Sequence, residues 1–294
     1  MTNILQAIAT IINNPIPDLL SYYKSQNNNK INGVGDALEY FVKDAFANTI
    51  GEPDFSNKEK KYEELFSFRG NPNNPPDFMI RNGDAIEVKK QKVKKTQISS
   101  AEIHLNSSYP KSKLFSNDPQ ISSACRKCEK WTEKDIVYAI GITSNDNKKE
   151  ILKMLWLIYG DCYAASKDSY ERIRYQITTG IHKIPDVEFI KTTELGKVKK
   201  VDPLGITDLR IRGMWNIKNP RIVFNYINTG YDPKANFQII AIMKDNKYSS
   251  FPDDSRTMIE SISGPGFFDI NTQPIKCPDN PVDFIPAKII TYKI

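Results

Sequence analysis

Residues 75–90 read PPDFMIRNGDAIEVKK, two short apolar segments on either side of a turn. The segments are residues 78–80 and 85–88, and Asn82 and Gly83 lie between them. Short apolar runs that flank Asn-Gly are typical of a β-hairpin. This stretch therefore predicts two adjacent antiparallel strands.

Three charged side chains distinguish this hairpin. Asp77 begins the first strand, and Glu87 and Lys89 are two residues apart on the second, so they share a face. Two carboxylates on adjacent strands can bind a hard cation such as Mg²⁺, and a lysine beside them can orient water or stabilise charge on a phosphate. The pattern fits metal-assisted phosphodiester hydrolysis, or else an edge hairpin with solvated charges.

The register of the hairpin separates these two interpretations. A two-residue turn would pair Asp77 with Val88 and point Asp77 away from Glu87. A three-residue loop over residues 81–83, with Gly83 in the left-handed conformation, places Asp77 opposite Glu87. A metal site therefore predicts the longer loop, a bulge, or an Asp77 outside the ladder.

A third acid, Glu39, lies in GDALEYFVKDAF, residues 35–46, where the apolar spacing predicts a helix over 36–49. Its position between the apolar residues allows two readings. Glu39 either forms a surface pair with Lys43, four residues on, or contributes an additional acid to the site.

Composition indicates a soluble globular protein. The chain has 294 residues, of which 39% are hydrophobic and 26% charged, and no run approaches the roughly 20 apolar residues of a membrane span. The first residues lack a basic region and a cleavage site, so we read them as an amphipathic helix over 2–13 and not a signal peptide. The spacing of the four cysteines suggests no disulfide framework, which fits a cytoplasmic protein.

The net charge of +6 is unevenly distributed. Residues 89–134 hold eleven basic and four acidic residues, and residues 196–221 hold seven basic and two acidic residues. A polyanion partner explains two such basic blocks, and so does a solvated lysine face.

The order of the remaining elements predicts an α/β fold with a mixed central sheet flanked by helices. The apolar segments 135–142 and 152–160 are expected to be buried strands. Helices are predicted over 120–131 and 167–180, the second with Tyr170, Ile173 and Ile177 on its inner face. Further strands are expected at 221–228, 236–244 and 287–294. We expect a catalytic core over 1–165 and a carboxyl-terminal sheet and loop extension over 166–294 that contributes to recognition of the partner.

These motifs resemble a known family. PD followed by ExK, with an upstream helical glutamate, resembles the PD-(D/E)xK nuclease superfamily, and the chain is more specifically similar to the NgoPII-type type II restriction endonucleases. The stretches that carry the resemblance span residues 33–228 and are GDALEYFVKDAF, NPPDFMIRNGDAIEVKK, LNSSYPKSKL, WTEKDIVYAIGI, ELGKVKKVDPLGITDLRIRGMW and NPRIVFNYI.

The resemblance implies a bacterial enzyme that uses Mg²⁺ to cut both strands of double-stranded DNA at a short palindrome, GGCC for this type. It implies that Asp77 and Glu87 are metal ligands, that Lys89 positions water, and that Glu39 is an accessory acid. A palindromic site matches a two-fold axis, so a homodimer is expected.

Two further groups of residues are candidates for DNA contact. Arg210 and Arg212 alternate along TDLRIRGMW, and arginine reads guanine well in the major groove, although two solvated arginines on a strand would look the same. A polar and basic loop is expected to contact phosphates. Its residues are Asn106, Ser107, Ser108, Lys111 and Lys113.

Two other functions are compatible with these residues. A structure-specific or repair nuclease of the same superfamily, and a DNA-binding protein without catalysis, remain alternatives. Cys125 and Cys128 lack the further ligands of a zinc site and are better explained as small buried residues on one helix face. The chain has no GxxxxGK phosphate loop, so no nucleotide cofactor is expected.

Overall fold

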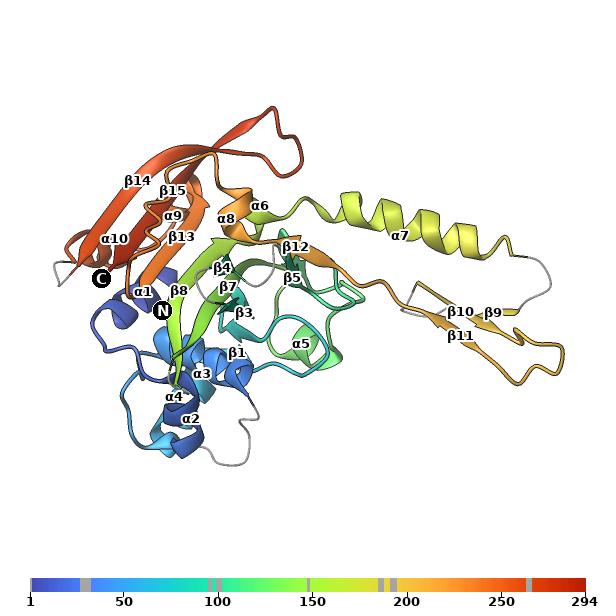
Figure 1. Cartoon of the computed structure of the whole chain (residues 1–294), viewed down its shortest axis with the longest axis horizontal. Coiled ribbons are helices and arrows are strands. Elements are labelled where there is room, and N and C mark those ends of the chain that lie inside the picture. Colours follow the sequence, from blue (N-terminus) through green and yellow to red (C-terminus); the bar gives the residue numbers. More distant parts are fainter. Residues whose placement is uncertain are drawn as a thin grey trace.

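The computed structural model describes residues 2–26, 33–94, 97–98, 102–146, 149–184, 188–190, 195–262 and 266–294. Within these residues, ten strands form one central sheet in the order β1-β2-β3-β7-β8-β13-β15-β14, with β4 beside β3 and β6 beside β7 (Figure 1). The strands are β1 (Phe66–Phe68), β2 (Phe78–Ile80), β3 (Ala85–Lys94), β4 (Gln97–Ile98), β6 (Lys113–Phe115), β7 (Glu133–Asp146), β8 (Lys149–Tyr159), β13 (Gln238–Lys244), β14 (Phe267–Lys276) and β15 (Phe284–Lys293).

The sheet is mixed, as the sequence predicts. Strand β3 runs parallel to β7, and β8 runs parallel to β13, whereas β7 and β8 are antiparallel. The apolar segments 135–142 and 152–160 form the central parts of β7 and β8, and Trp156 is fully buried there. Strands buried on both faces read as continuous apolar runs, which is why the sequence reveals them.

Four helices at the amino terminus pack together beside the sheet (Figure 1). They are α1 (Ile4–Ile12), α2 (Leu19–Gln26), α3 (Val34–Ala47) and α4 (Phe55–Leu65). The predicted helices over 2–13 and 36–49 are thus confirmed; α1 is shorter at both ends, and α3 begins and ends two residues earlier than predicted. Helix α3 contacts α1, α2, α4 and β3, so its position is fixed from several sides.

A buried carboxylate joins three of these helices. Asp44 of α3 is fully buried and accepts hydrogen bonds from Tyr23 of α2 at 2.8 Å, from Tyr62 of α4 at 2.5 Å and from Thr49 at 2.6 Å. Lys58 of α4 forms an ion pair with it at 2.6 Å. Because a buried charge must be paired, this cluster restricts how α2, α3 and α4 can pack.

The remaining helices of the body are short. They are α5 (Ser123–Lys127), α6 (Gly160–Tyr163), α8 (Pro220–Val223), α9 (Asp245–Ser249) and α10 (Asp253–Glu260). The helix predicted over 120–131 is confirmed only as α5, which Ser122 caps by accepting from the amide of Cys125. Cys125 is buried against Met79.

The strand predicted over 221–228 is wrong. This segment begins with α8 and continues as a turn. Asn219 accepts a hydrogen bond from the amide of Arg221 and Pro220 occupies the first turn, and this cap sets a helix in spite of the β-branched residues that follow. The strands predicted over 236–244 and 287–294 are confirmed as β13 and β15.

An arm extends from the body on one side (Figure 1). It consists of helix α7 (Lys167–Ile181) and a small sheet of β9 (Glu188–Ile190), β10 (Gly196–Lys199) and β11 (Leu209–Ile211). After the arm, β12 (Asn216–Lys218) pairs with β5 (Glu102–His104). We refer to residues 167–215 as the arm.

The predicted inner face of helix α7 is wrong. None of its described side chains is buried, and Ile173 and Ile177 are 37% and 41% exposed. The helix leaves the body, so its apolar side chains have no core to pack against. Only at its root does Tyr170 stack on Tyr109, with ring centroids 5.2 Å apart.

The carboxyl-terminal region adds β13, β15 and β14 to the same sheet that contains the hairpin. The proposed division into a catalytic core over 1–165 and a recognition extension over 166–294 therefore stays a prediction. Over the described residues, we find no helix with the length and apolar character that crossing a membrane requires.

Candidate active site

The hairpin has the register that a metal site requires. Phe78 pairs with Ile86 and Met79 with Ala85, and Asp77 lies just before this ladder, close to Glu87. The amide of Asp77 donates to the carbonyl of Ile86 at 3.0 Å, and the amide of Ile80 donates to the carbonyl of Asp84 at 2.9 Å. The predicted three-residue loop over residues 81–83 is confirmed.

The conformation of that loop differs from the prediction in one respect. Asn82, and not Gly83, adopts the left-handed conformation, with a φ of 55°. Asparagine tolerates this region better than most residues. Gly83 is needed for space instead, because a Cβ there would lie 2.8 Å from Cγ2 of Ile80.

Asp77 is held from two sides. Its Oδ2 accepts a 2.6 Å hydrogen bond from the amide of Val88 on β3. On the other side Gly70, with a φ of +90°, approaches so closely that a Cβ would lie 2.3 Å from the carbonyl oxygen of Asp77. Only glycine combines this φ with this approach. The carboxylate therefore stays beside β3.

Glu87 and Lys89 project from the same face of β3. Nζ of Lys89 lies 2.5 Å from Oε1 of Glu87, and the two side chains are only 20% and 10% exposed. The second oxygen, Oε2 of Glu87, is buried and has no hydrogen-bond partner. A buried carboxylate oxygen without a donor is costly, so this atom is available to a cation.

Glu39 reaches the same site from α3. Its Oε1 lies 2.6 Å from Nζ of Lys43, and the side chains of Glu39 and Lys43 are 30% and 7% exposed. The i, i+4 pair considered from the sequence thus exists, but it is mostly buried. Burial raises the pKa of Glu39; Lys43 opposes that rise, and the charge of Asp77 adds to it.

The carboxylates of the site repel one another, and a bound cation would reduce this repulsion. Burial and then the charge of Glu87 raise the pKa of Asp77 to about 7. Burial alone would lower the pKa of Lys89, but the carboxylates of Glu87 and Asp77 outweigh it and raise that pKa. Lys89 therefore carries a positive charge. The carboxylates of Glu39, Asp77 and Glu87 interact with the positive charges of Lys89 and Lys43.

These residues fit a hard divalent ion. Asp77 and Glu87 supply oxygen donors, and Oε2 of Glu87 is free to coordinate. In the parts of the chain that are described, no three His, Cys, Asp or Glu side chains gather closely enough to surround an ion. Mg²⁺ typically binds through one or two carboxylates and keeps several waters, so this donor set suits it.

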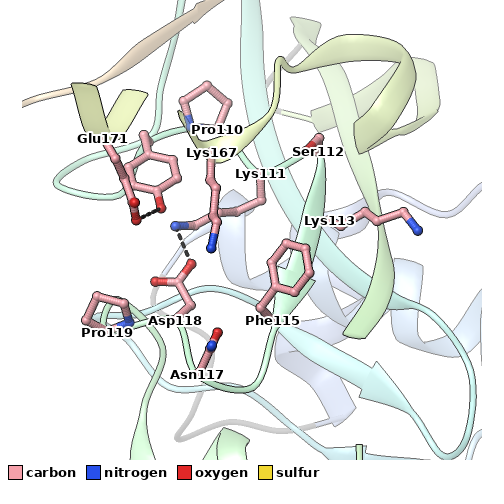
Figure 2. A pocket seen from close by; sticks show the side chains of 11 residues that line it. Pro110, Lys111, Ser112, Lys113, Phe115, Asn117, Asp118, Pro119, Lys167 and Glu171 are labelled. Atoms are coloured by element: carbon pink, nitrogen blue, oxygen red, sulfur yellow. Dashed lines mark hydrogen bonds and ion pairs between the residues drawn. The ribbon is translucent and has the colours of Figure 1, made fainter. Parts of the chain in front are cut away.

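The two lysines of the predicted phosphate loop both form ion pairs with acidic side chains. Lys111 is 3% exposed and forms a buried ion pair with Asp118 at 2.6 Å (Figure 2). Its Nζ lies 3.5 Å from the ring centroid of Tyr109. Lys113 is 38% exposed and pairs with Glu133. Lys111 is thus a buried residue of the loop, whereas Lys113 reaches the surface.

The other predicted DNA contacts are distributed unevenly. Asn106, Ser107, Arg210 and Arg212 are exposed, and Ser108 is half-buried. Ser107, Ser108 and Arg212 line a common pocket of about 290 Å³, and Arg210 on β11 does not. The sequence placed these segments about 100 residues apart, and the return of the arm through β12 brings them together.

The same pocket contains residues that sequence reasoning missed. They are Asn73, Asn74, Gln120, Arg174, Leu195 and Trp215. Arg174 lies on the helix that the sequence suggested would pack inward, and Trp215 is the last residue of the arm. No local pattern marks either one, because their proximity depends on how the arm meets the body.

Comparisons with known proteins identify the family of this chain. The family model of the NgoPII restriction endonuclease matches residues 2–276. The type II restriction enzyme NgoPII of Neisseria gonorrhoeae is 42% identical over 292 residues, which cover 99% of this chain and 100% of that protein. No solved structure matches the chain. The chain belongs to the NgoPII restriction endonuclease family.

Proposed function

We propose that this protein is a Mg²⁺-dependent type II restriction endonuclease with a PD-(D/E)xK core. It hydrolyses a phosphodiester bond in each strand of double-stranded DNA at a short palindrome, for which the family resemblance suggests GGCC. The observation that carries the proposal is the proximity of Asp77 to Glu87, with Lys89 on the same face of β3.

Asp77 and Glu87 would hold the metal. A bound Mg²⁺ polarises a phosphoryl oxygen and lowers the pKa of its bound water. The amide of Val88 keeps the Asp77 carboxylate in place, which leaves Oδ1 for coordination. Oε2 of Glu87 is the matching atom on β3.

Lys89 acts as a cation in this proposal. The neighbouring carboxylates raise its pKa, so it stays protonated and cannot accept a proton from water. It can donate hydrogen bonds that orient the attacking water or stabilise the charge that develops on the phosphate. Glu39, whose pKa is raised by burial, is the accessory acid at the edge of the site.

Recognition would come from the basic segments and the arm. Ser107, Ser108 and Arg212 line one polar pocket, and Asn106 and Lys113 lie at the surface nearby in the chain. A palindromic site calls for two equivalent copies of the catalytic site, so we propose a homodimer. Sedimentation of the protein with and without DNA tests this state, and a monomer that cuts both strands in one binding event contradicts it.

Incubation with plasmid DNA and Mg²⁺, with and without EDTA, tests the function. We expect discrete fragments that EDTA abolishes, and sequencing of the ends gives the site and the stagger. Cutting confined to junctions or lesions would instead identify a repair nuclease. A mobility shift without any cleavage would identify a binding protein.

A further inference from the structure

A polar hollow lies where the arm joins the body. This pocket of about 290 Å³ is lined from four parts of the chain: residues 73–75, residues 107–108, residues 119–120, and the arm with Arg174, Leu195, Arg212, Gly213 and Trp215. A smaller hollow shares Pro75 and Ser108 with it and is lined by Glu87. The pocket therefore adjoins a hollow that a proposed metal ligand lines.

The charged side chains described around this pocket are basic. Among the residues that the structure describes, Arg174 and Arg212 line it, and no aspartate or glutamate does. Amide and hydroxyl groups make up much of the rest, and Gln120 is fixed by accepting from Nζ of Lys111 at 2.6 Å and donating to the carbonyl of Ser107 at 3.0 Å. Such a lining suits an electronegative group that presents several acceptors in one plane.

Aromatic packing fixes where Arg174 points. Tyr170 stacks on Tyr109, and Trp215 meets both rings edge-on at centroid distances of 5.6 and 6.0 Å. Arg174 lies four residues after Tyr170, so it shares the face of α7 that this cluster turns toward the body. Arg172 is two residues from Tyr170, on another face, and is exposed.

We propose that this pocket is the specificity-determining site for the base pair next to the cleaved bond, and that Arg174 and Arg212 bind the O6 and N7 edge of a guanine. The inference rests on the proposed function. The ligand chemistry is that of electronegative DNA oxygens and nitrogens, which both a guanine edge and a backbone phosphate offer. Planar arginines with fixed amides favour the guanine edge.

The test compares binding of two duplexes by Arg174→Ala, Arg174→Lys and Arg212→Ala, with Arg172→Ala as the matched control. The first duplex contains the site that plasmid cleavage defines, and the second lacks it. Binding is measured in Ca²⁺ in place of Mg²⁺. Ca²⁺ binds oxygen ligands and is chosen so that the duplex is not cut during the measurement. Thermal melting verifies that each variant folds.

We expect each pocket variant to lose about 5- to 150-fold in affinity for the cognate duplex and less than about threefold for the other. Arg174→Lys should resemble Arg174→Ala, since lysine keeps the charge but loses the planar fork. Arg172→Ala should affect both duplexes equally. Replacement of one guanine by 7-deazaguanine, which removes N7, should weaken the wild type and add nothing further to Arg174→Ala or to Arg212→Ala.

Equal losses on both duplexes would assign the arginines to phosphate and overturn the proposal, as would cognate affinity unchanged in every pocket variant. These outcomes are separable from failure of the proposed function. A wild-type protein that cuts no DNA in Mg²⁺ contradicts the nuclease itself, whereas a wild type that cuts discrete sites while the variants discriminate normally contradicts only the pocket.

Discussion

The amide of Val88 on β3 donates a 2.6 Å hydrogen bond to Oδ2 of Asp77 at the start of β2. This bond joins the two strands at the level of the candidate metal site. It occupies one oxygen of Asp77, and Lys89 occupies one oxygen of Glu87, which leaves one oxygen of each acid for an ion.

Lys89→Ala should bind cognate DNA with an affinity within a few-fold of the wild type and cut it about 10²- to 10³-fold more slowly. The reason is that Lys89 acts on charge that develops during the reaction. Single-turnover cleavage and a binding titration measure the two effects. Lys90→Ala, one residue further on the opposite face of the strand, is the control and should cut normally. Undiminished cleavage by Lys89→Ala would remove this lysine from the mechanism.

Glu87→Gln keeps the size of the side chain but removes the charge that a divalent ion needs. In the wild type, Mg²⁺ or Ca²⁺ at about 100 times its dissociation constant should stabilise the fold by about 2.7 kcal/mol. The variant should show little of this stabilisation. Thermal unfolding with and without the ion provides the measurement, and equal metal stabilisation of both proteins would place the ion elsewhere.

The raised pKa of Asp77 predicts how metal binding depends on pH. Between its ordinary value of 3.8 and about 7, the folded metal-free protein holds one proton more than the unfolded chain at this group. Asp77 therefore makes the metal-free fold less stable as pH rises through this window. Metal binding must displace the same proton, so affinity should rise with pH up to about 7. Calorimetry at pH 6 in buffers of different ionisation enthalpy should detect proton release. Constant affinity between pH 5.5 and 7.5 would contradict the assignment.

Asp44→Ala should destabilise the protein by about 3–5 kcal/mol, because it leaves the ammonium of Lys58 buried without its partner. Urea unfolding measures the change. The exposed pair between Lys61 and Glu64 on the same helix is the control, and Glu64→Ala should cost less than about 1 kcal/mol. Similar losses in both variants would show that the buried cluster does not determine how α2, α3 and α4 pack.

Lys113→Ala tests the one lysine of the predicted phosphate loop that reaches the surface. If its ion pair with Glu133 opens to a phosphate, the variant should bind all DNA sequences more weakly. The slope of log affinity against log salt should fall by about 0.9. An effect confined to the cognate site would make Lys113 a base-reading residue instead.

The sequence by itself determined the strands of the hairpin that carries Asp77, Glu87 and Lys89. Its apolar runs set the strands β2 and β3, and the alternation of side chains placed Glu87 and Lys89 together, whereas the length of the loop was decided only by the structure. The buried strands β7 and β8 were predicted equally well, because a continuous apolar run can be recognised from the local sequence alone. Each of these features depends on neighbours within a few residues.

Only the tertiary structure decided the rest of the site. It buried Lys111 against Asp118, exposed Ile173 and Ile177 on the arm, and gathered Arg174 and Arg212 around one pocket. Those outcomes depend on contacts between segments distant in the chain, and no local periodicity encodes them. An amphipathic pattern such as that of α7 specifies a helix with an apolar face, but whether a core covers that face depends on where the rest of the chain lies.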